Sequence, residues 1–64
     1  MKFYLTSVDP YFDYYYSKLG LKKGEIEISS FEDLLALSKK VDCKLIVSTE
    51  DGIPTITIFD GYLS

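Results

Sequence analysis

Apolar and polar residues alternate in three regions of the chain, and this period of two predicts β-strands. Residues 2–8 (KFYLTSV), residues 25–29 (EIEIS) and both halves of residues 44–59 (KLIVSTEDGIPTITIF) show the alternation. The last region is interrupted by Asp51-Gly52, a pair that favours a two-residue type I′ turn. We therefore expect two single strands followed by a β-hairpin at the end of the chain.

The expected hairpin can be checked against its own pattern. With Asp51-Gly52 as the loop, the facing pairs fall into two kinds, two wholly apolar and two containing hydroxyls: Val47 with Ile56, Leu45 with Ile58, Ser48 with Thr55, and Ile46 with Thr57. Turn chemistry and alternation thus predict the same register. Pro54 beside the turn indicates that its strand begins at a sheet edge.

The first helix is predicted between an acidic cap and a glycine stop. Asp9 suits the N-cap, Pro10 suits the first helical position, and Gly20 suits the end of a helix of about ten residues. Five of the six residues from 11 to 16 are aromatic. A spacing of about 100° per residue divides them: the stripe expected to face inward is Phe12, Tyr15, Tyr16 and Leu19, with Tyr14 opposite it and Tyr11 on its flank.

The second helix is predicted to begin after Ser30. This residue and Asp33, three positions later, resemble a capping box, and Lys39-Lys40 suits the negative end of the helix dipole. The expected buried stripe comprises Phe31, Leu34, Leu35, Ser38 and Val41.

The resulting order, β-α-β-α-β-β, predicts one compact domain over residues 1–64. We expect an α/β (α+β) two-layer sandwich with a mixed four-stranded sheet, two helices on one face and a C-terminal β-hairpin. The other face of the sheet is then open, and alternation places on it Tyr4, Thr6, Glu25, Glu27, Ile46, Ser48, Thr55, Thr57 and Phe59.

The element order is similar to that of the small sulfur-carrier proteins of tRNA thiolation. Those proteins carry Cys-Pro-x-Pro at the start of the first helix, whereas this chain has Asp9-Pro10-Tyr11-Phe12 at that point. Because the cysteine is missing, the resemblance covers topology alone and implies no sulfur transfer.

Composition excludes several kinds of chemistry. The chain has no His, Trp, Arg, Asn or Gln, which removes imidazole-based catalysis, histidine zinc ligands and bidentate readers of phosphate. Its net charge is −3, which disfavours a nucleic-acid partner. One cysteine without a disulfide partner, and no apolar run long enough for a signal peptide or a membrane span, favour a cytoplasmic protein without membrane contact.

Reactive and metal-binding groups are sparse. Cys43 beside Lys44 is a candidate reactive thiol, but a small, partly buried apolar residue is the simpler interpretation. The carboxylate pairs, Asp9 with Asp13 and Glu25 with Glu27, are oxygen ligands without a third partner, so a helix cap and a solvated strand explain them better. We expect no catalytic residue, no metal and no cofactor.

Two surfaces are candidates for partner binding. On the first helix, Tyr11 and Tyr14 with Asp9, Asp13 and Lys18 would form an aromatic and acidic patch. On the open sheet, the candidates are Tyr4, Glu25, Glu27 and Phe59; the two aromatics could stack on bases, but the two carboxylates oppose a polyanion.

The function expected from these features is that of a small acidic protein-protein interaction module. By size, charge and composition the chain is similar to the inhibitors that phages and mobile elements direct against host enzymes or anti-phage nucleases, anti-CRISPR proteins and DNA mimics among them. Its partner would be a larger host protein, such as a nucleic-acid enzyme, and a homodimer remains open. The alternative is a small nucleic-acid-binding factor or accessory subunit that uses the open sheet.

Overall fold

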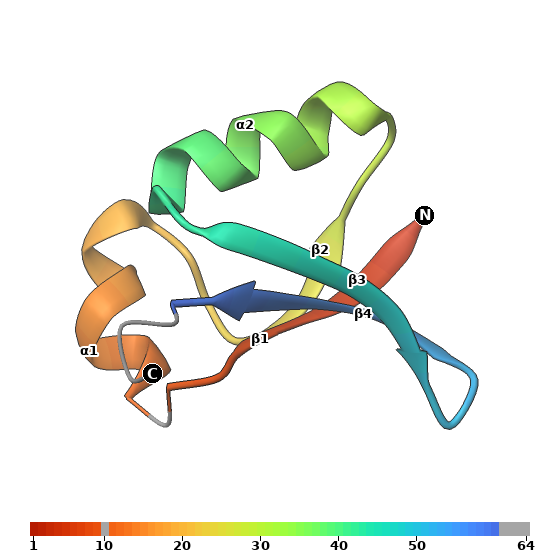
Figure 1. Cartoon of the computed structure of the whole chain (residues 1–64), viewed down its shortest axis with the longest axis horizontal. Helices are drawn as coiled ribbons and strands as arrows, with labels where there is room; N and C mark the ends of the chain where they lie inside the picture. The colour runs from red at the N-terminus through yellow and green to blue at the C-terminus, as the bar shows by residue number, and fades with distance from the viewer. Residues whose placement is uncertain (10, 61–64) are drawn as a thin grey trace.

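A computed structural model describes residues 1–9 and 11–60. Figure 1 shows a sheet with helices against it, in the order β-α-β-α-β-β. The elements are β1 (Lys2–Ser7), α1 (Phe12–Tyr16), the 3-10 helix η1 (Ser17–Leu19), β2 (Gly24–Glu27), α2 (Phe31–Val41), β3 (Lys44–Glu50) and β4 (Ile53–Phe59). The predicted order of elements is therefore confirmed.

The four strands form one mixed sheet in the order β2-β1-β4-β3. The central strands β1 and β4 are parallel, and each pairs antiparallel with its outer neighbour. The predicted fold class, an α+β arrangement with a C-terminal hairpin, is confirmed.

The hairpin has the predicted register. Val47 pairs with Ile56 and Ser48 with Thr55. Asp51 and Gly52 have φ angles of 52° and 80°, the left-handed values that both positions of a type I′ turn require. β4 itself is a central strand, but its pairing with β1 starts only at Thr55, one residue after the proline that marked an edge.

The hydrophobic core joins one face of the sheet to both helices. Leu5, Ile56 and Ile58 are fully buried on that face. They belong to one cluster with residues from α1 and α2: Phe12, Tyr16, Leu37 and Val41. The two helices therefore cover the same face of the sheet, and no element of residues 1–9 and 11–60 covers the other face, as predicted.

The first helix is shorter than predicted, and its buried stripe is narrower. α1 spans five residues and tightens into η1, which ends at Gly20 with a left-handed φ of 77°. Phe12 and Tyr16 are buried as expected, but Tyr15 and Leu19 are exposed, which contradicts the predicted stripe. Leu19 lies in η1, where each residue advances by more than 100° and the α-helical period no longer holds. Tyr15 lies in α1 itself, to one side of the line from Phe12 to Tyr16 that faces the core.

The predicted cap of the first helix is also modified. Oδ1 of Asp9 accepts a hydrogen bond of 2.8 Å from the amide of Tyr11, while Tyr11 itself is the N-cap residue. Pro10 lies outside the described residues. Asp9 thus orders the chain ahead of the helix rather than capping it directly.

The second helix begins after Ser30 as predicted but presents a different side to the core. Leu37 and Val41 are its buried residues, whereas Phe31 and Leu35 are exposed, so the predicted stripe is wrong at two of its positions. Instead of a reciprocal capping box, Asp33 accepts a 2.8 Å hydrogen bond from the amide of Ser29. Because α2 is turned about its axis relative to the predicted orientation, the apolar side chains of Phe31 and Leu35 lie exposed beside β3.

Candidate interaction surfaces

Three tyrosines form the most exposed aromatic group in the described part of the chain. Tyr11, Tyr14 and Tyr15 are 67%, 73% and 45% exposed, and together they line a hollow of about 340 Å³. We call this group the tyrosine surface. The sequence predicted the exposure of Tyr11 and Tyr14; it missed Tyr15, which the α-helical period had placed in the core.

Ring contacts connect the tyrosine surface to the core. The ring of Tyr14 meets that of Tyr15 edge to face at 5.2 Å between centroids, and Tyr15 lies 6.4 Å from buried Tyr16. Tyr16 in turn packs on Phe12 at 4.9 Å. The carbonyl of Tyr11 accepts hydrogen bonds from the amides of Tyr14 and Tyr15, so all three exposed residues sit on one ordered helical turn.

A buried hydrogen bond holds this turn against the end of β4. The hydroxyl of Tyr16 donates to Oδ2 of Asp60 at 2.5 Å, and both side chains are buried. Burial raises the pKa of the Tyr16 phenol far above its ordinary value, and the adjacent Asp60 raises it further. Within residues 1–9 and 11–60, Oδ1 of Asp60 has no hydrogen-bond partner, so Tyr16 is an important donor to this carboxylate.

The tyrosine surface is less acidic than predicted. Asp13 and Lys18 are exposed on the same segment, but Asp9 is buried and engaged with the backbone of Tyr11. The inclusion of Asp9 in an exposed acidic patch was therefore wrong. One carboxylate and one ammonium remain, and their charges balance.

The open side of the sheet, the sheet face, carries the residues that alternation predicted. A hollow of about 400 Å³ lies over β1, β4 and the hairpin turn, and its lining is Tyr4, Thr6, Glu50, Asp51, Ile53, Thr55 and Thr57. Phe59 is exposed on the same face but does not line this hollow; the ammonium of Lys44 lies 5.8 Å from its ring centroid. Tyr4 and Phe59 therefore do not form one stacking platform.

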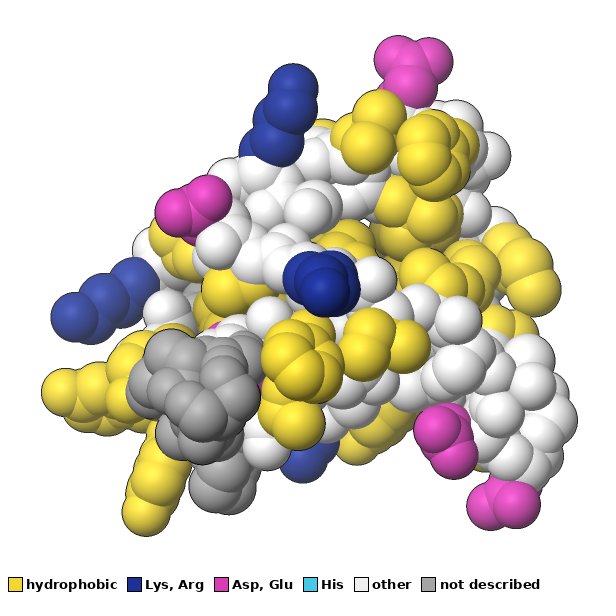
Figure 2. Space-filling view, in the orientation of Figure 1, with side chains coloured by type: hydrophobic (Ala, Val, Ile, Leu, Met, Phe, Trp, Pro, Cys, Tyr) yellow, Lys and Arg dark blue, Asp and Glu magenta, His cyan; other side chains and the backbone are white. Residues whose placement is uncertain are grey.

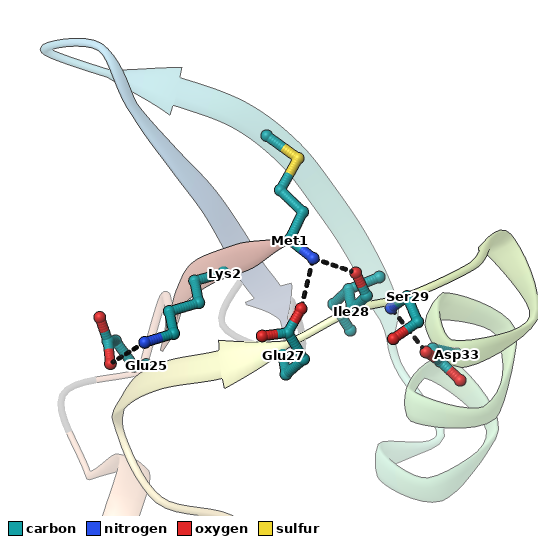
Figure 3. A network of polar contacts seen from close by, with 7 residues as sticks. All are labelled: Met1, Lys2, Glu25, Glu27, Ile28, Ser29 and Asp33. Carbon is teal, nitrogen blue, oxygen red and sulfur yellow. Dashed lines mark hydrogen bonds and ion pairs between the residues drawn. The ribbon is translucent and has the colours of Figure 1, made fainter.

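Two predicted residues of the sheet face are engaged in ion pairs. Nζ of Lys2 lies 3.9 Å from Oε1 of Glu25. The Met1 amino group pairs with Oε2 of Glu27, and Figure 3 shows both pairs side by side along β1 and β2. The same amino group donates to the carbonyl of Ile28 at 2.9 Å. Both pairs are exposed and contribute little to stability, but they reduce the net negative charge at this end of the sheet.

A third surface was not predicted. A hollow of about 250 Å³ lies between α2 and β3, and we call it the edge groove; its lining is Phe31, Leu34, Leu35, Ser38, Lys44, Leu45 and Val47. The signal was present in the sequence, because α2 has more apolar positions than one stripe can hold. The helical period alone does not determine which side of α2 packs into the core.

Catalytic and metal-binding features are limited. Cys43 is half-buried and packs against the core cluster, in agreement with its interpretation as an apolar residue. Among the described residues, no three side chains of the metal-binding types come together. No helix within the same residues has the length and apolar character needed to cross a bilayer.

Comparisons with known proteins do not place the chain in a family. No protein-family model matches it, and neither the curated proteins nor the solved structures contain a match.

Proposed function

We propose that this chain is a non-enzymatic interaction module that binds a larger protein through the tyrosine surface. The observation that carries the proposal is the grouping of Tyr11, Tyr14 and Tyr15 around one hollow, on a turn whose opposite side is fixed in the core. Exposed aromatics scattered singly are ordinary, whereas three on one ordered turn form a contiguous patch.

The chemistry of tyrosine suits this role. Its side chain has two rotatable bonds, so it loses little conformational entropy on binding, and it combines a large apolar ring with a polar tip. The ring contacts from Tyr14 through Tyr15 to Tyr16 restrict these side chains before a partner arrives. Such preorganisation lowers the cost of association.

The partner expected for this surface offers apolar pockets for rings and acceptors for phenol hydroxyls. Because Asp13 and Lys18 balance each other locally, recognition rests on shape more than on charge. The overall charge of −3 adds a modest long-range attraction toward a basic partner. An inhibitor that covers a functional surface of a host enzyme would fit this description better than a phosphate mimic, which needs a row of exposed carboxylates.

We also propose the cytoplasm as its compartment, since the lone thiol of Cys43 suits a reducing environment. Nucleic-acid binding by the sheet face is disfavoured. That face and its turn carry Glu25, Glu27, Glu50 and Asp51 against two lysines, and its two aromatics lie apart. Phosphate attraction, which dominates such binding, would oppose it.

The proposal is tested by capture from a lysate of the native host, with and without phage infection. Immobilised wild-type protein should retain a specific protein that Tyr11→Ala with Tyr14→Ala does not retain. Both side chains are largely exposed, so the double variant should keep its melting temperature within a few degrees.

Tyr4→Ala is the matched control, because it makes the same truncation on the sheet face. It should retain the same protein as the wild type. Loss of capture in Tyr4→Ala but not in the double variant would move the binding site to the sheet. Equal capture by all three proteins would contradict a role for either surface.

A further inference from the structure

The strand β3 presents an open edge of the sheet. It is seven residues long, and among the described residues its only sheet neighbour is β4. Proteins usually protect such edges with a central charge, a proline or a very short strand. The opposite edge, β2, has four residues, two of them glutamates, whereas the middle of β3, residues 45–49, contains neither charge nor proline.

The sequence of β3 is complementary to itself. If two copies pair antiparallel with Val47 opposite Val47, then Lys44 of each copy faces Glu50 of the other, and Leu45 faces Thr49. This register places two opposite-charge pairs at the ends and an apolar pair on the two-fold axis. Within the described residues, neither Lys44 nor Glu50 forms an ion pair inside its own chain.

The backbone of β3 supports the same register. In a hairpin closed by a two-residue turn, the residues flanking the turn form a hydrogen-bonded pair, here Glu50 with Ile53. Every second residue before Glu50 then directs its amide toward β4, so Leu45, Val47 and Thr49 direct theirs to the open edge. These are the residues that would become hydrogen-bonded pairs across a two-fold axis at Val47.

The exposed apolar side chains beside β3 lie on the side where the second copy would sit. Val47 is 51% exposed, and it shares the edge groove with Phe31 and Leu35, which are 70% and 47% exposed. Figure 2 shows hydrophobic side chains gathered over the region where Figure 1 has the start of α2 and the strand β3. A two-fold axis perpendicular to the sheet keeps both copies of α2 on one face, flanking the seam.

We propose that two copies of this chain pair through β3 into a continuous eight-stranded sheet, with Val47 on the two-fold axis. The edge grooves of both copies face each other across the seam, and Phe31 and Leu35 are covered there. The terminal ion pairs set the register, while the backbone ladder and the apolar contacts supply the affinity. The dimer shares no residue with the tyrosine surface, so each proposal can fail without the other.

The test is size-exclusion chromatography with light scattering over a concentration series. Wild-type protein should reach twice the 7.3 kDa of one chain. Val47→Lys places two ammonium groups on the axis and should weaken the dimer roughly a hundredfold. Val8→Lys is the matched control, because Val8 is also a valine, is 48% exposed and follows β1, which β4 separates from β3; it should leave the dimer intact.

Charge reversal tests the register independently of how well Val47→Lys folds. Lys44→Glu places a glutamate opposite Glu50 of the other copy at both ends of the paired strands, and it should weaken the dimer about tenfold. Adding Glu50→Lys to the same chain restores both pairs and should return the dimer to within roughly threefold of wild type. A monomer at every concentration would overturn the proposal, and so would a dimer that is insensitive to Val47→Lys or unrestored by the double reversal.

Discussion

Leu37→Ala should destabilise the domain far more than Leu35→Ala, although the two leucines lie two positions apart on α2. Leu37 is only 5% exposed and belongs to the core cluster, whereas Leu35 faces the edge groove. Truncating a buried leucine costs about 2–5 kcal/mol, and a partly exposed one much less. Because the free energy of unfolding of a domain of this size is roughly 3–10 kcal/mol, Leu37→Ala should remove a large share of its stability.

Urea denaturation measures both losses. The comparison is best made in a Val47→Lys background, where the lost contacts of Leu35 in the proposed dimer do not contribute. Similar losses for the two variants would contradict the burial of Leu37 over Leu35, and a larger loss for Leu35→Ala would mean that α2 presents the predicted stripe to the core.

Tyr16→Phe should lower the free energy of unfolding by about 1–3 kcal/mol at neutral pH. The substitution removes the hydroxyl that donates to buried Asp60 and leaves that carboxylate without this donor. The ring is kept, so packing against Phe12 is preserved. Asp60→Asn and the double variant complete a thermodynamic cycle, in which we expect a coupling energy above about 1 kcal/mol. Additive losses would show that the hydrogen bond is unimportant.

The same variant predicts a change in alkaline stability. The pKa of Tyr16 is raised in the folded state, by burial first and by Asp60 second, above its ordinary value of 10.0. The contribution of the protonated phenol is therefore complete below pH 10 and is lost as the pH rises above it, because the unfolded chain releases this proton first.

Between pH 9 and pH 11, wild-type protein should lose on the order of 1 kcal/mol more stability than Tyr16→Phe. Every other ionisable group is common to the two proteins, so its contribution cancels in the difference. Urea denaturation at the two pH values provides the measurement, and parallel losses in the two proteins would contradict a buried, protonated Tyr16.

Local patterns predicted most of the fold. Strict alternation and Asp51-Gly52 predicted the hairpin with its register, because each strand face and the turn geometry impose the same pairing. Gly20 and Ser30 marked helix boundaries that the structure contains. These features depend on residues that are neighbours in the sequence, so a single sequence is enough to predict them.

The burial of helix residues was predicted wrongly where it depends on tertiary packing or on a change of helix type. Tyr15 lies exposed because Phe12 and Tyr16, one helical turn apart, face the core and leave Tyr15 to one side. Leu19 lies in the 3-10 turn, which the α-helical period does not include. α2 has apolar residues on two sides, so the choice between Leu35 and Leu37 depends on how the helix crosses the sheet. The ion pair of Lys2 with Glu25 requires β1 beside β2, which alternation does not specify.

The candidate site was predicted in part. Tyr11 and Tyr14 are exposed as the helical geometry indicated, whereas Asp9 is buried and Tyr15 joins them. The edge groove was not predicted, because the apolar residues of α2 that line it were expected to be buried in the core. The partner-binding role of the tyrosines remains a prediction.

The most direct test of that role is calorimetric titration of the captured protein, once purified, with the wild-type chain and with Tyr11→Ala/Tyr14→Ala. We expect a saturable complex whose affinity falls at least roughly a hundredfold in the double variant, as is typical of two aromatic anchors at the centre of an interface. Equal affinities for the two proteins, with both folded, would contradict it.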